Sequence, residues 1–118
     1  NKILLNFNKS KKIRNSLNIV KENRYTKPSW FGIPIIGNKN FIKSKFIRKI
    51  EKMGVETRPI ISGNFLNQPS VKKYKLIEKS KMHNAEYINK KGFFIGLPTK
   101  EIKNKILNKL VKSFEECI

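Results

Sequence analysis

Aspartate is absent from the sequence, and histidine, cysteine and tryptophan each occur once among its 118 residues. A single cysteine, Cys117, excludes an internal disulfide and any metal site built from cysteines, and a single histidine, His83, argues against a zinc site. All eight acidic residues are glutamates, and most lie beside lysines at helical spacing, which is typical of solvated charges on helix faces. Without a second histidine, a nucleophile paired with a base also has little support.

A long apolar run is missing too. No stretch reaches the roughly eighteen consecutive apolar residues that a membrane-spanning helix needs. Residues 1–6 contain neither a long apolar core nor a small-residue cleavage site, which argues against a signal peptide. We therefore expect a cytoplasmic protein with no membrane partner. A chain of this length suits one domain, residues 1–118, built around one hydrophobic core.

Positive charge dominates the composition, with a formal net charge of +19. Such a charge is compatible with a small basic module that binds nucleic acid or an acidic partner, because lysine and arginine neutralise phosphates. However, the 27 basic residues are 23 lysines and only 4 arginines, accompanied by 14 asparagines and 17 isoleucines. These residues share A/T-rich codons, and the lysines are spread along the whole chain. Genomic base bias therefore explains the charge as well, and nucleic acid is the less favoured partner.

The first part of the chain carries a helical pattern. Apolar residues recur at spacings of three, four and seven through residues 1–23, and no N-cap precedes them. The pattern predicts a helix that is already running at residue 1, as in a chain cut from something longer. Pro28 then disfavours helix at Lys27. We therefore assign residues 1–27 to an incomplete interdomain helix and linker, and residues 28–118 to a sheet-and-helix core.

Three segments read as strands because they are short and rich in β-branched and aromatic residues: 29–37, 55–60 and 93–97. Pro34 lacks a backbone donor, which predicts an edge position or a bulge for the first of them. The last is wholly apolar and is predicted to be central. Together with the helices below, these strands predict an α+β fold with about three mainly antiparallel strands and helices packed on one face. The other face would need cover from another domain or subunit.

Three further segments are predicted to be helices because their apolar residues recur at helical spacing and capping residues flank them. Residues 41–53 recur at helical spacing and end at Gly54, and the last helix carries a broad apolar stripe from Ile102 to Phe114. Between them, residues 69–74 suggest a helical turn and residues 72–81 show no clean period. The expected N-caps are Asn40 for helix 41–53, Asn84 for a short helix 85–90 ended by Gly92, and Thr99 for the last helix.

The stretch from Glu56 to Pro69 is the candidate binding loop. It leaves a predicted strand with an arginine, crosses a proline, and places Ser62, Gly63 and Asn64 in a polar turn between Ile61 and Phe65. Loops carried on a rigid strand are where binding groups tend to lie. The residues alone thus indicate an exposed loop at a site whose main chemistry lies elsewhere.

Four motifs occur in an order and spacing that resemble the C-terminal part of DegT/DnrJ/StrS-type sugar aminotransferases and the related 3-dehydratases. Each motif alone is weak, but the four in sequence cover nearly the whole chain. They are Trp30-Phe31-Gly32-Ile33-Pro34-Ile35, Glu56-Thr57-Arg58-Pro59, Ser62-Gly63-Asn64-Phe65 with Gln68-Pro69, and Asn84-Ala85-Glu86-Tyr87 leading to Gly92-Phe93-Phe94-Ile95-Gly96.

This resemblance implies the small domain of a fold-type I pyridoxal-phosphate enzyme that transaminates or 3-dehydrates nucleotide-linked 4-keto-6-deoxy sugars, in deoxysugar and lipopolysaccharide O-antigen biosynthesis. It also implies a large domain that binds pyridoxal 5′-phosphate through a lysine, or has a histidine in its place, and a homodimer when full length. No lysine here lies in a recognisable cofactor-binding context, and no aspartate is available for the pyridinium nitrogen. We therefore expect no catalytic residue in this chain, which alone would be inactive.

The resemblance makes five residues candidates for substrate binding. Arg58 could pair with a phosphate of the ligand, or simply with Glu56 at a strand end. The turn could present N–H groups and an amide to a sugar, or merely reverse the chain. The Ile61-Ser62-Gly63-Asn64 sequence looks like the dehydratase branch, although aminotransferases stay open. The candidate set is Arg58, Ser62, Gly63, Asn64 and Gln68, with Phe65 as either lining or core; Glu86 is read as a carboxylate favoured by a helix dipole.

Overall fold

The computed structural model describes residues 2–74, 76 and 80–118. It is built around a four-stranded sheet in the order β1-β2-β4-β3, in which every neighbouring pair is antiparallel. The strands are β1 (Leu17–Ile19), β2 (Gly32–Gly37), β3 (Thr57–Pro59) and β4 (Gly92–Gly96). The predicted α+β fold is confirmed, with one strand more than the sequence suggested, and β4 is central as predicted.

The single helix predicted for residues 1–23 is wrong. Helix α1 (Lys2–Lys9) stops at Ser10, whose backbone is extended and whose Oγ accepts a hydrogen bond from the Ile13 N–H at 3.3 Å. Ser10 thereby caps a second short helix, α2 (Lys11–Ser16), which runs directly into β1. In β1, Leu17 and Ile19 are buried while Asn18 is exposed, so the burial period has changed to that of a strand.

Pro34 lies on an inner strand, so the predicted edge position is also wrong. It pairs with Phe94 of β4 on one side of β2, and its carbonyl accepts a hydrogen bond from the Val20 N–H on the other. A residue in an antiparallel strand points both of its backbone groups the same way, so the missing N–H of Pro34 faces β1. The missing N–H therefore costs no hydrogen bond to β4. On the other side, it lies just beyond Ile19, the last residue of β1 that pairs with β2.

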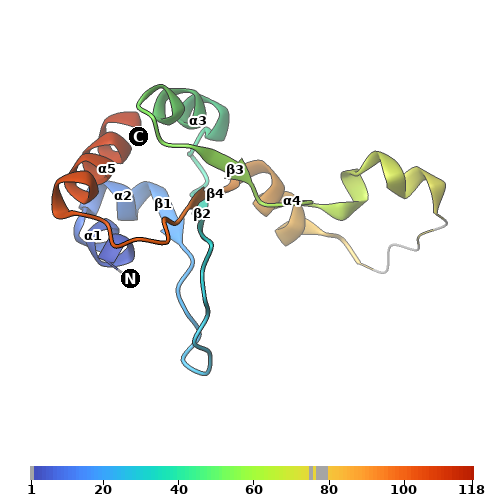
Figure 1. Ribbon diagram of the computed structural model, residues 1–118. Coiled ribbons are helices and arrows are strands. Elements are labelled where there is room, and N and C mark those ends of the chain that lie inside the picture. Colours follow the sequence, from blue (N-terminus) through green and yellow to red (C-terminus); the bar gives the residue numbers. More distant parts are fainter. Residues whose placement is uncertain (1, 75, 77–79) are drawn as a thin grey trace.

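Four helices pack on one face of the sheet: α1, α2, α3 (Lys43–Lys52) and α5 (Asn104–Cys117) (Figure 1). At the centre of this core, the Phe46 ring lies 5.1–5.4 Å, centroid to centroid, from the rings of Phe41, Phe93 and Phe114. Phe7 from α1 completes the cluster through Phe114, at 4.6 Å. The other face of the sheet, with Pro34, Ile36 and Phe94, is only half-buried.

The glycine predicted to end α3 does so, whereas the residues predicted to begin three of the helices do not. Gly54 has a φ of +84°, and it and Val55 donate to the Glu51 and Ile50 carbonyls, which makes the predicted stop of α3 a Schellman motif. The three predicted N-caps are wrong, because each helix begins at a different residue and has no side-chain cap. The residues at the N-cap positions are Ile42 for α3, Met82 for α4 (His83–Lys91) and Lys103 for α5.

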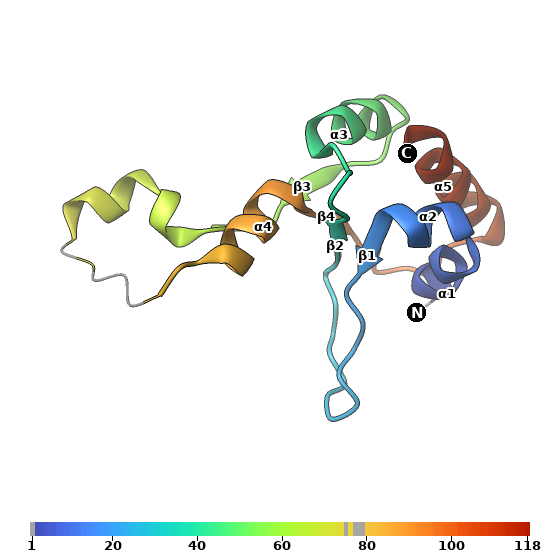
Figure 2. The same cartoon turned by 180° about the vertical axis from the view of Figure 1, so that it is seen from behind.

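Two excursions leave this body, the β1–β2 connection and an arm between β3 and α4 (Figure 1, Figure 2). They account for a radius of gyration of 15.9 Å, where a compact chain of this length would have about 13–14 Å. The arm contains the 3₁₀ helices η1 (Phe65–Asn67) and η2 (Pro69–Lys73), so the predicted turn near residue 70 is confirmed. Part of the predicted irregular segment, residues 75 and 77–79, lies outside the described residues.

Membrane insertion finds no support in the helices that the structure describes, since none of them combines the length and apolar character needed to cross a bilayer.

Candidate functional site

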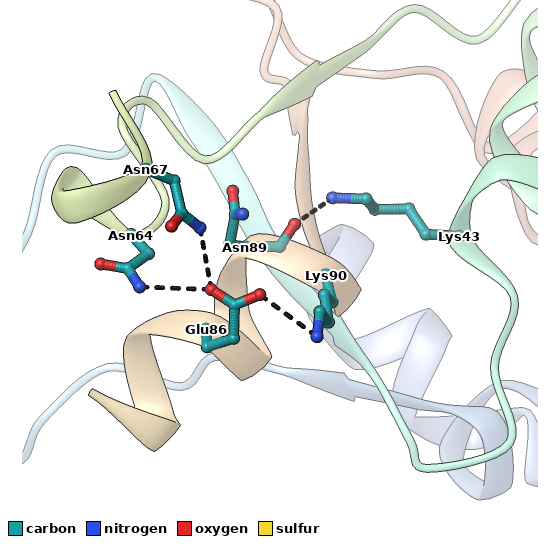
Figure 3. A network of polar contacts seen from close by, with 6 residues as sticks. All are labelled: Lys43, Asn64, Asn67, Glu86, Asn89 and Lys90. Carbon is teal, nitrogen blue, oxygen red and sulfur yellow. Dashed lines mark hydrogen bonds and ion pairs between the residues drawn. The ribbon is translucent and has the colours of Figure 1, made fainter. Parts of the chain in front are cut away.

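Residues 61–68, the central part of the candidate binding loop predicted from Glu56 to Pro69, lie against helix α4 and are joined to it through one carboxylate (Figure 3). Oε2 of Glu86 accepts a hydrogen bond from the Asn64 side-chain amide at 3.2 Å and another from the Asn67 amide at 2.9 Å. Its other oxygen pairs with the Lys90 ammonium at 3.2 Å. The loop that follows β3 is therefore held by the helix that precedes β4.

Asn64 is the least exposed residue of this loop, with 8% of its surface accessible. Its Oδ1 accepts from the Leu66 N–H at 3.1 Å, which caps η1, while its Nδ2 reaches Glu86. Both ends of the amide thus hold the loop in shape. The Asn64 side chain therefore has a structural role within the loop.

Gly63 brings the backbone of the loop against Asn89 of α4. Its φ is +55°, and a Cβ at this position would lie 2.2 Å from Asn89 Oδ1. The residue therefore has to be glycine both for its backbone conformation and for the close approach to the helix.

Substituting Gly63 by alanine tests that requirement. The left-handed backbone costs an L-residue about 1–2 kcal/mol, and the added Cβ also displaces the Asn89 side chain. We expect Gly63→Ala to destabilise the folded chain by about that amount, measured by urea unfolding. Adding Asn89→Ala to this variant should relieve only the contact and leave the backbone cost. Full recovery in the double variant would show that the backbone conformation does not matter.

Ser62 and Gln68 close the loop, because the Gln68 Nε2 donates to the Ser62 carbonyl at 3.1 Å. Within the described residues, the Ser62 hydroxyl and the backbone N–H groups of Ser62 and Asn64 have no hydrogen-bond partner. Unpaired donors of this kind can bind oxygen acceptors of another molecule.

Arg58 lies apart from this cluster, on the edge strand β3. It is exposed and pairs with the exposed Glu56 carboxylate, the simpler of its two expected roles. It lines an apolar groove of about 1220 Å³ between the sheet and α5, whose other walls include Pro59, Ile61, Phe94, Ile106 and Leu110. The structure thus brings together Ser62, Gly63, Asn64 and Gln68 of the predicted set, whereas Arg58 makes no hydrogen bond to them within the described part of the chain and shares this groove with Ile61 of the loop.

Helix α4 is tied to the body by contacts at its C-terminal end. The Lys43 ammonium donates to the carbonyls of Asn89 and Gly92, and partial burial lowers the pKa of this lysine. The Tyr87 hydroxyl donates to the Gly37 carbonyl at 2.9 Å. Lys91 adds bonds to the carbonyls of Lys39 and Phe41. The helix that carries Glu86 is therefore a fixed support.

Sequence reasoning missed the network of Glu86, Asn67 and Asn89. Glu86 does lie in the first turn of α4, where a helix dipole favours a carboxylate, but its hydrogen bonds are to the loop. One signal was available, because the motif containing Glu86 and the motif containing Asn64 both belonged to the family resemblance. Nothing in their spacing of 22 residues revealed that the two would touch.

Hydrogen bonds from Asn64 and Asn67, followed by the ion pair with Lys90, lower the pKa of the Glu86 carboxyl. A depressed carboxyl pKa contributes stability above the unfolded-state pKa, and that contribution disappears as the pH falls through the folded-state pKa. We expect an NMR titration of the Glu86 side-chain carboxyl to show this depressed pKa. Asn67→Ala should move it back toward the ordinary value, whereas Asn108→Ala on α5 should not. An unchanged pKa in Asn67→Ala would contradict the contact.

No family model matches the chain. It is 38% identical over 71 residues to the GDP-4-keto-6-deoxy-D-mannose 3-dehydratase of Escherichia coli, covering 58% of this chain and 18% of that protein. The Yersinia pseudotuberculosis enzyme of the same name is 32% identical over 83 residues, covering 68% and 21%. The chain is a homologue of these dehydratases.

Solved structures agree with the sequence match. The E. coli dehydratase with bound hydrated PLP superimposes with a TM-score of 0.79 at 27% identity, over 96% of this chain and 28% of that one. A variant of that dehydratase with bound GDP-perosamine gives a TM-score of 0.80 at 28% identity, with the same coverage. The resemblance predicted from sequence is thus confirmed for the dehydratases. The chain spans about a fifth of the length of these curated relatives.

Proposed function

We propose that this chain forms the small C-terminal domain of a PLP-dependent enzyme acting on a nucleotide-linked 4-keto-6-deoxy sugar. The observation that carries the proposal is the superposition of 96% of the chain on a 3-dehydratase, with a TM-score of 0.79. That superposition leaves only a few per cent of the chain unmatched.

The finer proposal is that the substrate is GDP-4-keto-6-deoxymannose and the reaction is loss of its 3-hydroxyl. Both curated relatives carry this activity in their names. The Ile61-Ser62-Gly63-Asn64 sequence of the loop favours the same branch. Transamination of the same class of sugar is the competing reaction, and the two differ in the product.

The residues of this chain do not by themselves fit PLP. No aspartate exists to pair with the pyridinium nitrogen. Among the described glutamates, Glu56, Glu101 and Glu116 lie in ion pairs at the surface, and Glu51 accepts a hydrogen bond from Thr57. In this proposal the cofactor is held by a large domain in the complete protein, which forms a homodimer. This chain then contributes binding and positioning and carries no catalytic group.

Within that division of labour, the loop donors of Ser62 and Asn64 bind oxygen atoms of the sugar. The guanidinium of Arg58 exchanges its exposed partner Glu56 for a ligand phosphate or stays in its ion pair. An exposed ion pair of this kind contributes at most about 1 kcal/mol, so a phosphate can displace it at little cost.

The test is to express the complete reading frame that contains this chain and to incubate the purified protein with PLP, glutamate and GDP-4-keto-6-deoxymannose. Mass spectrometry of the nucleotide products distinguishes a 3-deoxy sugar from an amino sugar. A 3-deoxy product supports the finer proposal, and an amino sugar supports only the broader one. No conversion of either kind, together with a frame that encodes no large domain, would overturn the proposal.

A further inference from the structure

We propose that Glu86 is a positioning residue, whose carboxylate holds the loop of residues 61–68 so that the Ser62 and Asn64 donors face the nucleotide sugar. The functional half of this inference rests on the proposed function. The structural half rests on contacts between α4 and the loop alone, shown in Figure 3.

Apolar packing holds this loop only weakly. Of its three large apolar side chains, Ile61 and Phe65 are 84% and 54% exposed, and Leu66 is half-buried. The loop also lies at the base of the arm that leaves the body (Figure 1). Its position therefore depends strongly on polar contacts with α4, in which Glu86 is the partner of both Asn64 and Asn67.

A single oxygen of Glu86 accepts hydrogen bonds from side chains at both ends of η1. Asn64 precedes this 3₁₀ turn and Asn67 is its last residue, and both side-chain amides donate to the same Oε2. A carboxylate that accepts two bonds from opposite ends of a turn fixes both the position and the rotation of that turn. Its negative charge makes each bond stronger than one between neutral groups.

The carboxylate also selects the orientation of the Asn64 amide. An ionised carboxylate only accepts hydrogen bonds, so Nδ2 of Asn64 must face Glu86 and Oδ1 must face the Leu66 N–H. A neutral glutamine at position 86 has its own NH₂ group, which repels an amide donor when rotated toward it. Glu86→Gln therefore keeps the size of the side chain but removes the preference for one orientation of the Asn64 amide.

Glu116 provides a matched control on α5. It forms an ion pair with Lys112 at 3.8 Å with the same spacing of four residues that links Glu86 to Lys90, and among the described residues it makes no hydrogen bond or ion pair with the loop. Glu116→Gln removes the same charge from a helix surface. Any effect on the loop that is confined to Glu86→Gln is thus an effect of the contacts with Asn64 and Asn67.

The structural experiment is hydrogen exchange of the full chain, read at the Leu66, Asn67 and Gln68 amides, which donate within the loop. We expect exchange to become about tenfold faster in Glu86→Gln and to stay unchanged in Glu116→Gln. Asn67→Ala, at an exposed position, should increase the exchange rate less. This variant replaces Glu86→Gln in the experiment if Glu86→Gln does not fold. Equal exchange in wild type, Glu86→Gln and Asn67→Ala would overturn the inference.

The functional experiment uses the complete enzyme and separates binding from chemistry. We expect Glu86→Gln to raise the KM for the nucleotide sugar several-fold, to change kcat less, and to leave PLP absorbance unchanged. An unaltered KM despite faster loop exchange would overturn the functional half. A wild-type enzyme without activity would count against the proposed function, while the exchange result would still decide the role of Glu86 in the loop.

Discussion

Phe46→Ala is expected to lower the free energy of unfolding by about 3–5 kcal/mol, a large part of the stability of a small domain. Phe46 is 2% exposed, and its ring lies 5.1–5.4 Å, centroid to centroid, from the rings of Phe41, Phe93 and Phe114. These partners come from the segment before α3, from β4 and from α5. Removing the ring therefore leaves a cavity at the point where three parts of the core meet.

Urea unfolding followed by circular dichroism measures this change. Phe65→Ala is the control, since its side chain is 54% exposed and the same truncation there should cost less than about 0.5 kcal/mol. Phe46→Leu should fall between the two, because leucine fills part of the cavity. A loss from Phe46→Ala no larger than that from Phe65→Ala would show that the aromatic cluster does not organise the core.

The elements with a strong apolar period were predictable, because period follows directly from burial on one side. Helix α5 buries Leu107 and Phe114 of the predicted stripe, although Ile106 is 59% exposed. Strand β4 is a short run without polar residues, and that composition was enough to predict its central place. These patterns need no knowledge of distant residues, so a single sequence contains them.

What escaped prediction depends on partners far along the chain. Leu17–Ile19 is three residues long and continues a helical spacing, so only its pairing with β2 makes it a strand. Pro34 was assigned to an edge or a bulge because proline has no N–H to donate. Its inner position is tolerated because the missing donor faces β1, just where the pairing of β1 ends. Caps failed because asparagine and threonine also suit the turns that precede these helices.

In the candidate site, too, the local features were predictable and the long-range contact was not. The turn at Ser62, Gly63 and Asn64 was readable from local chemistry, and the structure gives Gly63 a φ of +55°. The support from Glu86 was not readable, because it joins helix α4 to residues of the arm that lie 19 and 22 positions earlier in the sequence. Family resemblance identified both motifs and left the contact between them to the structure.

The second large effect is expected at Gly92, where α4 ends and β4 begins. A Cβ at this position would lie 2.5 Å from the Ile88 carbonyl oxygen and 2.8 Å from Ile60 Cδ1. The first of these atoms belongs to the helix backbone and cannot rotate away. We expect Gly92→Ala to destabilise the fold by about 1–3 kcal/mol, the usual cost of forcing extra atoms into a packed region.

Steric contact alone causes this cost, because Gly92 has a φ of −89° and a ψ of 144°, which any residue adopts. Gly96 at the other end of the same strand provides the control: a Cβ there would meet nothing within 4 Å. Gly96→Ala should change the unfolding free energy by less than about 0.5 kcal/mol, or stabilise slightly through the unfolded chain.

Ile60→Ala separates the two contacts of Gly92. In the double variant with Gly92→Ala, the contact with the Ile60 side chain is gone and the contact with the Ile88 carbonyl remains, so only part of the loss should be recovered. The remaining strain must move the end of α4, and with it Glu86 and the loop that Glu86 holds. Faster hydrogen exchange at Leu66 and Asn67 in Gly92→Ala would show that movement. Equal stability of Gly92→Ala and Gly96→Ala would contradict it, since the junction would then have room for a side chain.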